Sequence, residues 1–183
     1  MDDVAPPHVE EYSASEHNKD VFVSPWHGEN KVKENKKSAN FLAKKLGKKV
    51  YLLPRLEQNN KVQAPLRKTL LPPGVKEGKN PDYLIGGILF DGKSMMNIKP
   101  ITGIKPKKKN ELYRRKIQTR ISNAFDQADG AIIEVPRFVS RRNIARAVKG
   151  KLKLVSGDKF VIIKHGNSCY VYNKGYLKQK KQG

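Results

Sequence analysis

The chain has 183 residues and a formal net charge of +21 at pH 7, with 38 Lys and Arg against 17 Asp and Glu. Its single cysteine, Cys169, excludes an intrachain disulfide and a cysteine-rich zinc site. So large a basic excess is typical of proteins that bind polyanions, with nucleic acid the first candidate and an acidic protein the second. A lysine-rich surface that only keeps the protein soluble is the alternative.

The sequence shows no recognisable targeting signal or membrane-spanning segment. No apolar stretch approaches the roughly 20 residues of a membrane-spanning helix, and the N-terminus lacks the basic-then-apolar pattern of a signal peptide. We therefore expect a soluble chain that another component carries if the protein leaves its cell.

The first third of the chain predicts an arm, a helix and a strand. Residues 1–28 hold prolines, acids and histidines without periodicity, which predicts an extended arm. Residues 29–46 show a helical stripe that ends at Gly47, and residues 50–53 form a short apolar run that predicts a buried strand. The arm histidines, which we expect to be solvent-exposed, are His8, His17 and His27.

Loops and a hairpin follow. Residues 55–79 contain three prolines, two glycines and few apolar anchors, which predicts a long mobile loop. A hairpin is expected over residues 80–93, and a basic, proline-interrupted segment over 97–110.

The last third alternates helices and strands. Helical periodicity covers residues 111–129, and a second basic helix, capped by Ser140, continues to Lys149. Strands are expected over 131–135, 160–163 and 170–172. The order predicts an α/β fold with a mixed sheet of about five or six strands flanked by helices.

The hairpin carries the chemistry. Paired glycines, Gly86 and Gly87, favour a two-residue turn that needs φ > 0 at both positions. Asp82, Asp91 and Lys93 would then share one face, with the two acids roughly 5 Å apart. Because like charges at that spacing repel, a divalent cation between them is the hypothesis that removes the penalty. The expected cross-strand pairs are Ile85 with Ile88, Leu84 with Leu89, Tyr83 with Phe90, and Asp82 with Asp91.

Pro81-Asp82, eight intervening residues and then Asp91-Gly92-Lys93 resemble the PD-(D/E)xK signature of the restriction-endonuclease-like nucleases. The resemblance implies that family's fold and a further acid from the preceding helix. Glu34 is the first choice for that acid and Glu29 the second.

A closer resemblance covers most of residues 30–165. The succession ENKKSANFLAKKLG, KKVYLLPR, KNPDYLIGG, FDGKS and AFDQADGAIIEV is similar to the C-terminal transfer-RNA nuclease toxin domains of contact-dependent growth-inhibition systems. It implies a metal-dependent RNase that is delivered into competitor bacteria, acts in their cytoplasm and is neutralised by a cognate immunity protein. We expect such an inhibitor to be acidic, because it would mimic phosphate in a basic groove.

The resemblance implies a nuclease domain over residues 29–178, with a basic tail over 179–183. Asp82 and Asp91 would hold Mg²⁺ or Mn²⁺, with the Gly92 carbonyl and Glu34 as further ligands. Lys93 would orient the attacking water or stabilise the phosphate charge. The alternative is a solvated hairpin face on which Lys93 merely neutralises two acids.

Phosphate contacts are expected from basic residues outside the hairpin. They are Lys105, Lys107, Lys108, Lys109, Arg114, Arg115, Arg137, Arg141, Arg142 and Arg146. Two other functions stay open from the residues alone. One is a DNA endonuclease of the same fold, and the other is a non-catalytic basic protein that binds nucleic acid.

Overall fold

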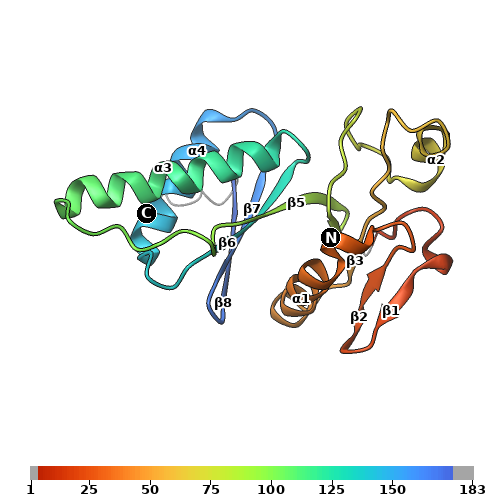
Figure 1. The fold of residues 1–183 in the computed structure, drawn as a ribbon, viewed down its shortest axis with the longest axis horizontal. Coiled ribbons are helices and arrows are strands. Elements are labelled where there is room, and N and C mark those ends of the chain that lie inside the picture. The colour runs from red at the N-terminus through yellow and green to blue at the C-terminus, as the bar shows by residue number, and fades with distance from the viewer. Residues whose placement is uncertain (1–3, 175–183) are drawn as a thin grey trace. The chain divides into compact units, whose positions relative to one another are not determined.

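The computed structural model describes residues 4–174, apart from the side chain of Asn30. The chain forms two compact units, Met1–Asp91 and Gly92–Gly183, so the division lies inside the domain predicted over 29–178. The described residues contain four α-helices and one mixed sheet with the strand order β1 to β8 (Figure 1). The α/β class is confirmed, whereas the expectation of five or six strands is too low.

The two additional strands come from the segment predicted as an arm. β1 (Ser13–Ser15) and β2 (Asn18–Val23) pair antiparallel, and β2 pairs parallel with β3 (Val50–Leu52). Residues 13–23 therefore belong to the sheet and are not an extended arm. The alternation of apolar and polar residues in these strands is too short to predict them. They are stabilised by a tertiary contact, in which Phe22 stacks on Tyr51 at 5.2 Å between ring centroids.

The helix α1 (Glu29–Leu46) has the predicted bounds and packs beside β2 and β3 (Figure 1). Ala39 and Leu42 on its inner side are fully buried. Gly47 ends the helix with φ 61°, and its N–H donates to the carbonyl of Ala43 at 2.9 Å. This left-handed conformation is the one for which glycine is favoured, so the predicted stop is confirmed.

The loop predicted over 55–79 is wrong for residues 63–70, which form the helix α2 (Gln63–Leu70). The helix is short, and Pro65 near its start weakens the helical signal although proline is tolerated in a first turn. Leu70 and Leu71 pack with Leu56 in a small buried cluster. That long-range contact supplies the apolar anchor that the local pattern lacks.

The second unit has two helices on one side of its strands. β5 (Ile88–Ser94) contains the division at Asp91, so only its last residues belong to this unit. β6 (Gly130–Val135) precedes the antiparallel pair of β7 (Phe160–His165) and β8 (Ser168–Asn173). β6 and β7 are parallel. The helices α3 (Pro106–Phe125) and α4 (Arg141–Leu154) contact each other, and both contribute to the main core cluster (Figure 1).

The bounds of both helices differ from the predicted ranges: α3 is shifted toward the N-terminus, and α4 extends beyond its predicted end. α3 begins five residues earlier than expected because Pro106 occupies its first turn, where its fixed φ suits a helix. The hydroxyl oxygen of Ser140 accepts from the backbone N–H of Asn143 at 3.3 Å, as the predicted cap requires, but α4 continues to Leu154. The tail over 179–183 lies outside the described residues.

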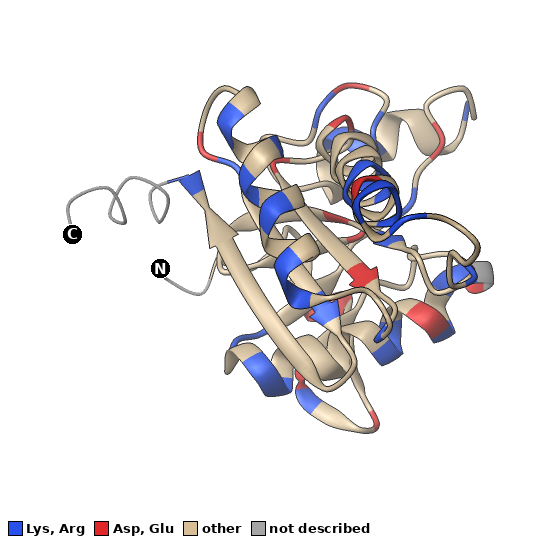
Figure 2. Ribbon diagram, turned by 90° about the vertical axis from the view of Figure 1, so that its left-hand side faces the viewer, with Lys and Arg blue, Asp and Glu red and all other residues tan. Residues whose placement is uncertain are grey.

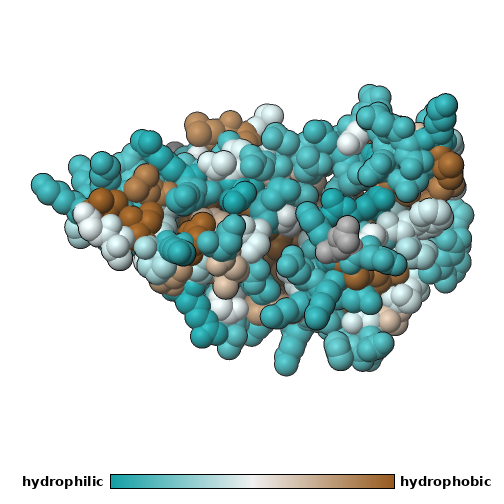
Figure 3. Space-filling view, in the orientation of Figure 1, coloured by the Kyte–Doolittle hydropathy of each residue, from teal (hydrophilic) through white to brown (hydrophobic). Residues whose placement is uncertain are grey.

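Within residues 4–174, no helix is both long and apolar enough to cross a membrane. The face seen in Figure 3 is mainly hydrophilic, with scattered hydrophobic side chains.

Candidate active site

The hairpin has the predicted turn and register. Gly86 and Gly87 have φ values of 55° and 76°, the positive values that a two-residue primed turn needs. β4 (Tyr83–Ile85) and β5 then pair as expected. The paired residues are Ile85 with Ile88, Leu84 with Leu89, and Tyr83 with Phe90.

The two acids lie at the open end of this hairpin, but not as a ladder pair. Asp82 precedes β4 in a bend, and its N–H donates to the carbonyl of Phe90 at 3.0 Å. The predicted pairing of Asp82 with Asp91 is therefore corrected: the last pair of the ladder at this end is Tyr83 with Phe90. Pro81, which has no N–H, cannot continue the ladder. The backbone of Asp82 is bonded to the carbonyl that directly precedes Asp91, so the two residues adjoin.

Both acids are buried. Asp82 is 6% exposed and Asp91 is 4% exposed. The solvent exposure assumed in the alternative of a solvated hairpin face is therefore wrong for these two acids. A buried carboxylate is costly unless it is paired, hydrogen-bonded or bound to a metal. Carboxylate oxygens are also the donors that Mg²⁺ and Mn²⁺ prefer, so the side chains present fit a hard divalent cation.

Arg55 is a partner of Asp82 that the sequence did not single out. Its Nη1 lies 3.3 Å from Oδ1 of Asp82, and its side chain is 34% exposed. The Arg55 N–H also donates to the carbonyl of Trp26 at 2.8 Å, which fixes the backbone at this point. The Arg55 guanidinium therefore orients one oxygen of the Asp82 carboxylate, and the Arg55 side chain stays partly in contact with solvent.

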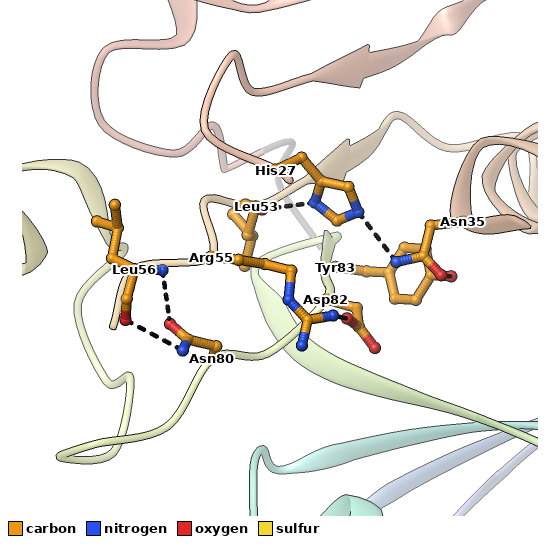
Figure 4. A network of polar contacts seen from close by, with 8 residues as sticks. All are labelled: His27, Asn35, Leu53, Arg55, Leu56, Asn80, Asp82 and Tyr83. Atoms are coloured by element: carbon orange, nitrogen blue, oxygen red, sulfur yellow. Dashed lines mark hydrogen bonds and ion pairs between the residues drawn. The ribbon is translucent and has the colours of Figure 1, made fainter. Parts of the chain in front are cut away.

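A chain of hydrogen bonds through His27, Asn35 and Tyr83 ends at the residue that follows Asp82 (Figure 4). With its proton on Nδ1, His27 donates to the carbonyl of Leu53 at 2.6 Å, and its Nε2 accepts from Nδ2 of Asn35 at 2.9 Å. The hydroxyl of Tyr83 donates to Oδ1 of Asn35 at 3.2 Å. The chain from His27 through Asn35 to Tyr83 thus joins the start of α1 to the first residue of β4.

The expectation that all three histidines are exposed is wrong for His27, which is 1% exposed, and confirmed for His8 and His17. Burial lowers the pKa of His27, while the Leu53 carbonyl and the nearby charge of Asp82 act in the opposite direction. Neither contact of His27 is local in sequence. Only its place at the end of the predicted arm, two residues before the predicted helix, could have indicated a buried role.

Asn80 anchors the approach to the hairpin (Figure 4). Its Oδ1 accepts from the N–H of Leu56 at 3.2 Å and from Arg67 at 2.9 Å, and its Nδ2 donates to the Leu56 carbonyl at 3.1 Å. Arg67 also donates to the carbonyl of Lys79 at 2.6 Å. These contacts hold the segment that leads into Asp82 against the loop after β3.

The predicted helix acids lie apart from this network. Glu34 and Glu29 are both exposed, and Asn35 is the α1 side chain that contacts Tyr83. The carboxylates of Glu34, Asp82 and Asp91 do not form a group with ligand atoms within 4.8 Å of one another. Among residues 4–174, the group that meets this criterion consists of the exposed His8, Glu10 and Glu11.

Gly92 and Lys93 continue β5 directly after Asp91, and both are half-buried. A hollow of about 690 Å³ lies elsewhere, between α2 and the loop over residues 72–78, and its lining does not include Asp82 or Asp91.

The predicted phosphate-binding residues all lie in the second unit. Figure 2 shows Lys and Arg along the helices, with Asp and Glu fewer. Arg115 is exposed but pairs with Glu111 at 2.5 Å, which reduces the charge it offers. Lys109 and Arg114 are half-buried. The exposed members are Lys105, Lys107, Lys108, Arg137, Arg141, Arg142 and Arg146.

No protein-family model matches the chain, and no curated protein or solved structure is significantly similar to it.

Proposed function

We propose that the chain is a metal-dependent endonuclease that hydrolyses phosphodiester bonds in RNA, with transfer RNA the favoured substrate. The observation that carries the proposal is the adjacency of two buried carboxylate residues, Asp82 and Asp91, at the open end of the β4–β5 hairpin. The chain has 38 Lys and Arg against 17 Asp and Glu, and this basic excess supports a polyanionic substrate.

In the proposed mechanism the protein supplies ligands, orientation and charge. Asp82 and Asp91 would hold Mg²⁺ or Mn²⁺, with the carbonyl of Gly92 as a further donor. The bound cation supplies Lewis acidity toward a phosphate oxygen and lowers the pKa of a coordinated water. Arg55 positions the Asp82 carboxylate through the contact at 3.3 Å.

Two further residues complete the proposal. Lys93, two residues after Asp91 on β5, would orient the attacking water or stabilise the negative charge that develops on the phosphate. Glu34 on α1 would act through water, since it does not group with the two buried acids. The resemblance to toxin domains adds an acidic immunity protein as partner and the cytoplasm of a target bacterium as the place of action.

Incubating the protein with total RNA and with plasmid DNA, each with Mg²⁺, Mn²⁺ or EDTA, tests the function. We expect discrete, metal-dependent cuts in small RNA. Metal-dependent nicking of plasmid alone would assign a DNA endonuclease, and absence of cleavage from both would leave a basic binding protein.

Replacing Asp91 by Asn tests the site. We expect RNA cleavage to fall by at least about 100-fold, the scale of removing one preorganised electrostatic group, while circular dichroism shows an unchanged fold. Asp158→Asn, a matched change at an exposed acid, should keep full activity. An Asp91→Asn variant that cleaves at the wild-type rate would remove Asp91 from the mechanism.

A further inference from the structure

We infer that the second unit carries a stacking site for an unpaired nucleotide, with the ring of Phe138 as the platform and neighbouring arginines as phosphate contacts. The inference rests on the proposed function for its substrate class, RNA. It concerns a binding step that needs no metal, so it can be tested separately.

The site lies where two parallel strands end. β6 and β7 are paired in register from Gly130 with Phe160 to Val135 with His165. Both strands therefore end at the same edge of the sheet, and the segment that follows β6 carries Arg137 and Phe138. Open α/β sheets bind ligands at the carboxyl ends of such strands.

The ring of Phe138 is anchored on one side and exposed on the other. It is 43% exposed, although it lies next to a core residue: its centroid is 5.9 Å from the ring of Tyr113, at 49°. Tyr113 is itself held, because its hydroxyl accepts from the N–H of Ile101 at 2.8 Å. A ring that already contacts a held side chain loses little freedom when a base stacks on it.

The sequence that follows β6 around Phe138 is basic. Between Glu134 and Asp158 the sequence contains seven Lys and Arg and no acid. Arg137, Arg141 and Arg142 lie within four residues of Phe138 and are exposed. A lone exposed aromatic residue is common on protein surfaces, but one flanked by three arginines matches the combination that single-stranded nucleic acid requires.

Two of these arginines are held in place rather than left free. The guanidinium carbon of Arg141 lies 4.6 Å from the ring centroid of Tyr170, a cation–π contact that leaves its N–H groups available to phosphate. Arg137 donates to Oδ1 of Asn167 at 3.5 Å. Its side chain passes so close to Gly166 that an added Cβ there would lie 2.7 Å from Nε. A side chain at position 166, in the turn between β7 and β8, would therefore require this arginine to shift.

An unpaired base is the ligand that these features favour. In a duplex both faces of each base are covered, so phosphate contacts alone would act, whereas a loop or single strand can offer a base to the ring. An acidic protein would also bind the arginines and would pack an apolar side chain on Phe138, but the net charge of +21 makes nucleic acid the first candidate.

The test measures RNA binding by the full chain in EDTA, where the proposed cleavage cannot occur. Fluorescence anisotropy would compare a labelled uridine oligonucleotide of about 12 nucleotides, within the usual site size, with an RNA duplex of the same length. The variants are Phe138→Leu, which keeps apolar packing against Tyr113, and Phe138→Trp, which keeps a stacking ring. Leu154→Ala is the control, since Leu154 is 81% exposed at the end of α4, a helix that begins after Phe138.

We expect Phe138→Leu to weaken single-strand binding by about 5- to 150-fold, the usual effect of losing one stacked base, and to leave duplex binding within about twofold. Phe138→Trp and Leu154→Ala should bind the single strand as wild type does. Unchanged single-strand binding by Phe138→Leu would overturn the inference, as would an equal loss on the duplex, which would indicate an electrostatic surface only. If Phe138 controls binding but no RNA is ever cut, the inference stands and the nuclease proposal fails.

Discussion

His27 lies buried between the carbonyl of Leu53 and the amide of Asn35, in an arrangement that a neutral ring satisfies. Its pKa in the folded protein is lowered, chiefly by burial, from the ordinary value of 6.5. The unfolded chain therefore takes up a proton first as the pH falls. The stability that this group contributes is fully present above about pH 6.5 and is lost as the pH falls toward the folded pKa.

The free energy of unfolding in urea, measured from pH 7.5 to about pH 5, checks this. We expect the wild type to lose up to about 1.4 kcal/mol per pH unit from His27 below pH 6.5. His27→Gln should show a shallower slope, whereas His17→Gln, at an exposed histidine, should keep the wild-type slope. Identical slopes in all three proteins would show that His27 does not titrate differently on folding.

The buried acids give a second prediction at the scale of residues. A cation that binds only the folded protein stabilises it by mass action, by about 2.7 kcal/mol at 100 times its Kd. We expect Mn²⁺ to raise the Tm of the wild type, and Asp82→Asn to abolish most of that rise. If Mn²⁺ shifts the Tm of both proteins equally, the ion binds elsewhere, for example at the exposed group of His8, Glu10 and Glu11.

At the scale of elements, the end of α1 shows how the backbone conformation of one residue contributes to the free energy of unfolding. Gly47 has φ 61°, and an added Cβ there would have nothing within 4 Å. Any cost of substitution is therefore one of backbone conformation rather than of packing. We expect Gly47→Ala to lower the free energy of unfolding by about 1 kcal/mol, and Gly47→Asn to cost less because asparagine tolerates the left-handed region. Equal losses for Ala and Asn in urea unfolding would contradict this reason.

At the scale of the whole molecule, the net charge of +21 governs association with polyanions. Each phosphate contact made by a lysine or arginine adds about 0.7 to the magnitude of the slope of log affinity against log salt for a single strand. We expect Arg142→Ala to reduce the slope for RNA by about that amount. Lys44→Ala, on the outer side of α1, should leave it unchanged. Binding that does not weaken with salt would refute the electrostatic component altogether.

The sequence by itself determined the elements whose signals are local. The apolar stripe and Gly47 define α1, the Gly86-Gly87 pair defines the turn and the register of the hairpin, and Ser140 caps α4. In each case the residues that decide the conformation lie within a few positions of one another, so their pattern is visible in the chain.

Only the tertiary structure decided the rest. β2 becomes a strand because β3 lies beside it, and α2 is stabilised through Leu56 and Leu71. Asp82 acquires Arg55 from 27 residues away, and His27 acquires Leu53 from 26 residues away. The bend at Asp82, which removes it from the ladder, could not be read from the alternation of side chains. Burial and partner choice depend on which distant segments meet, and no local pattern of residues encodes that meeting.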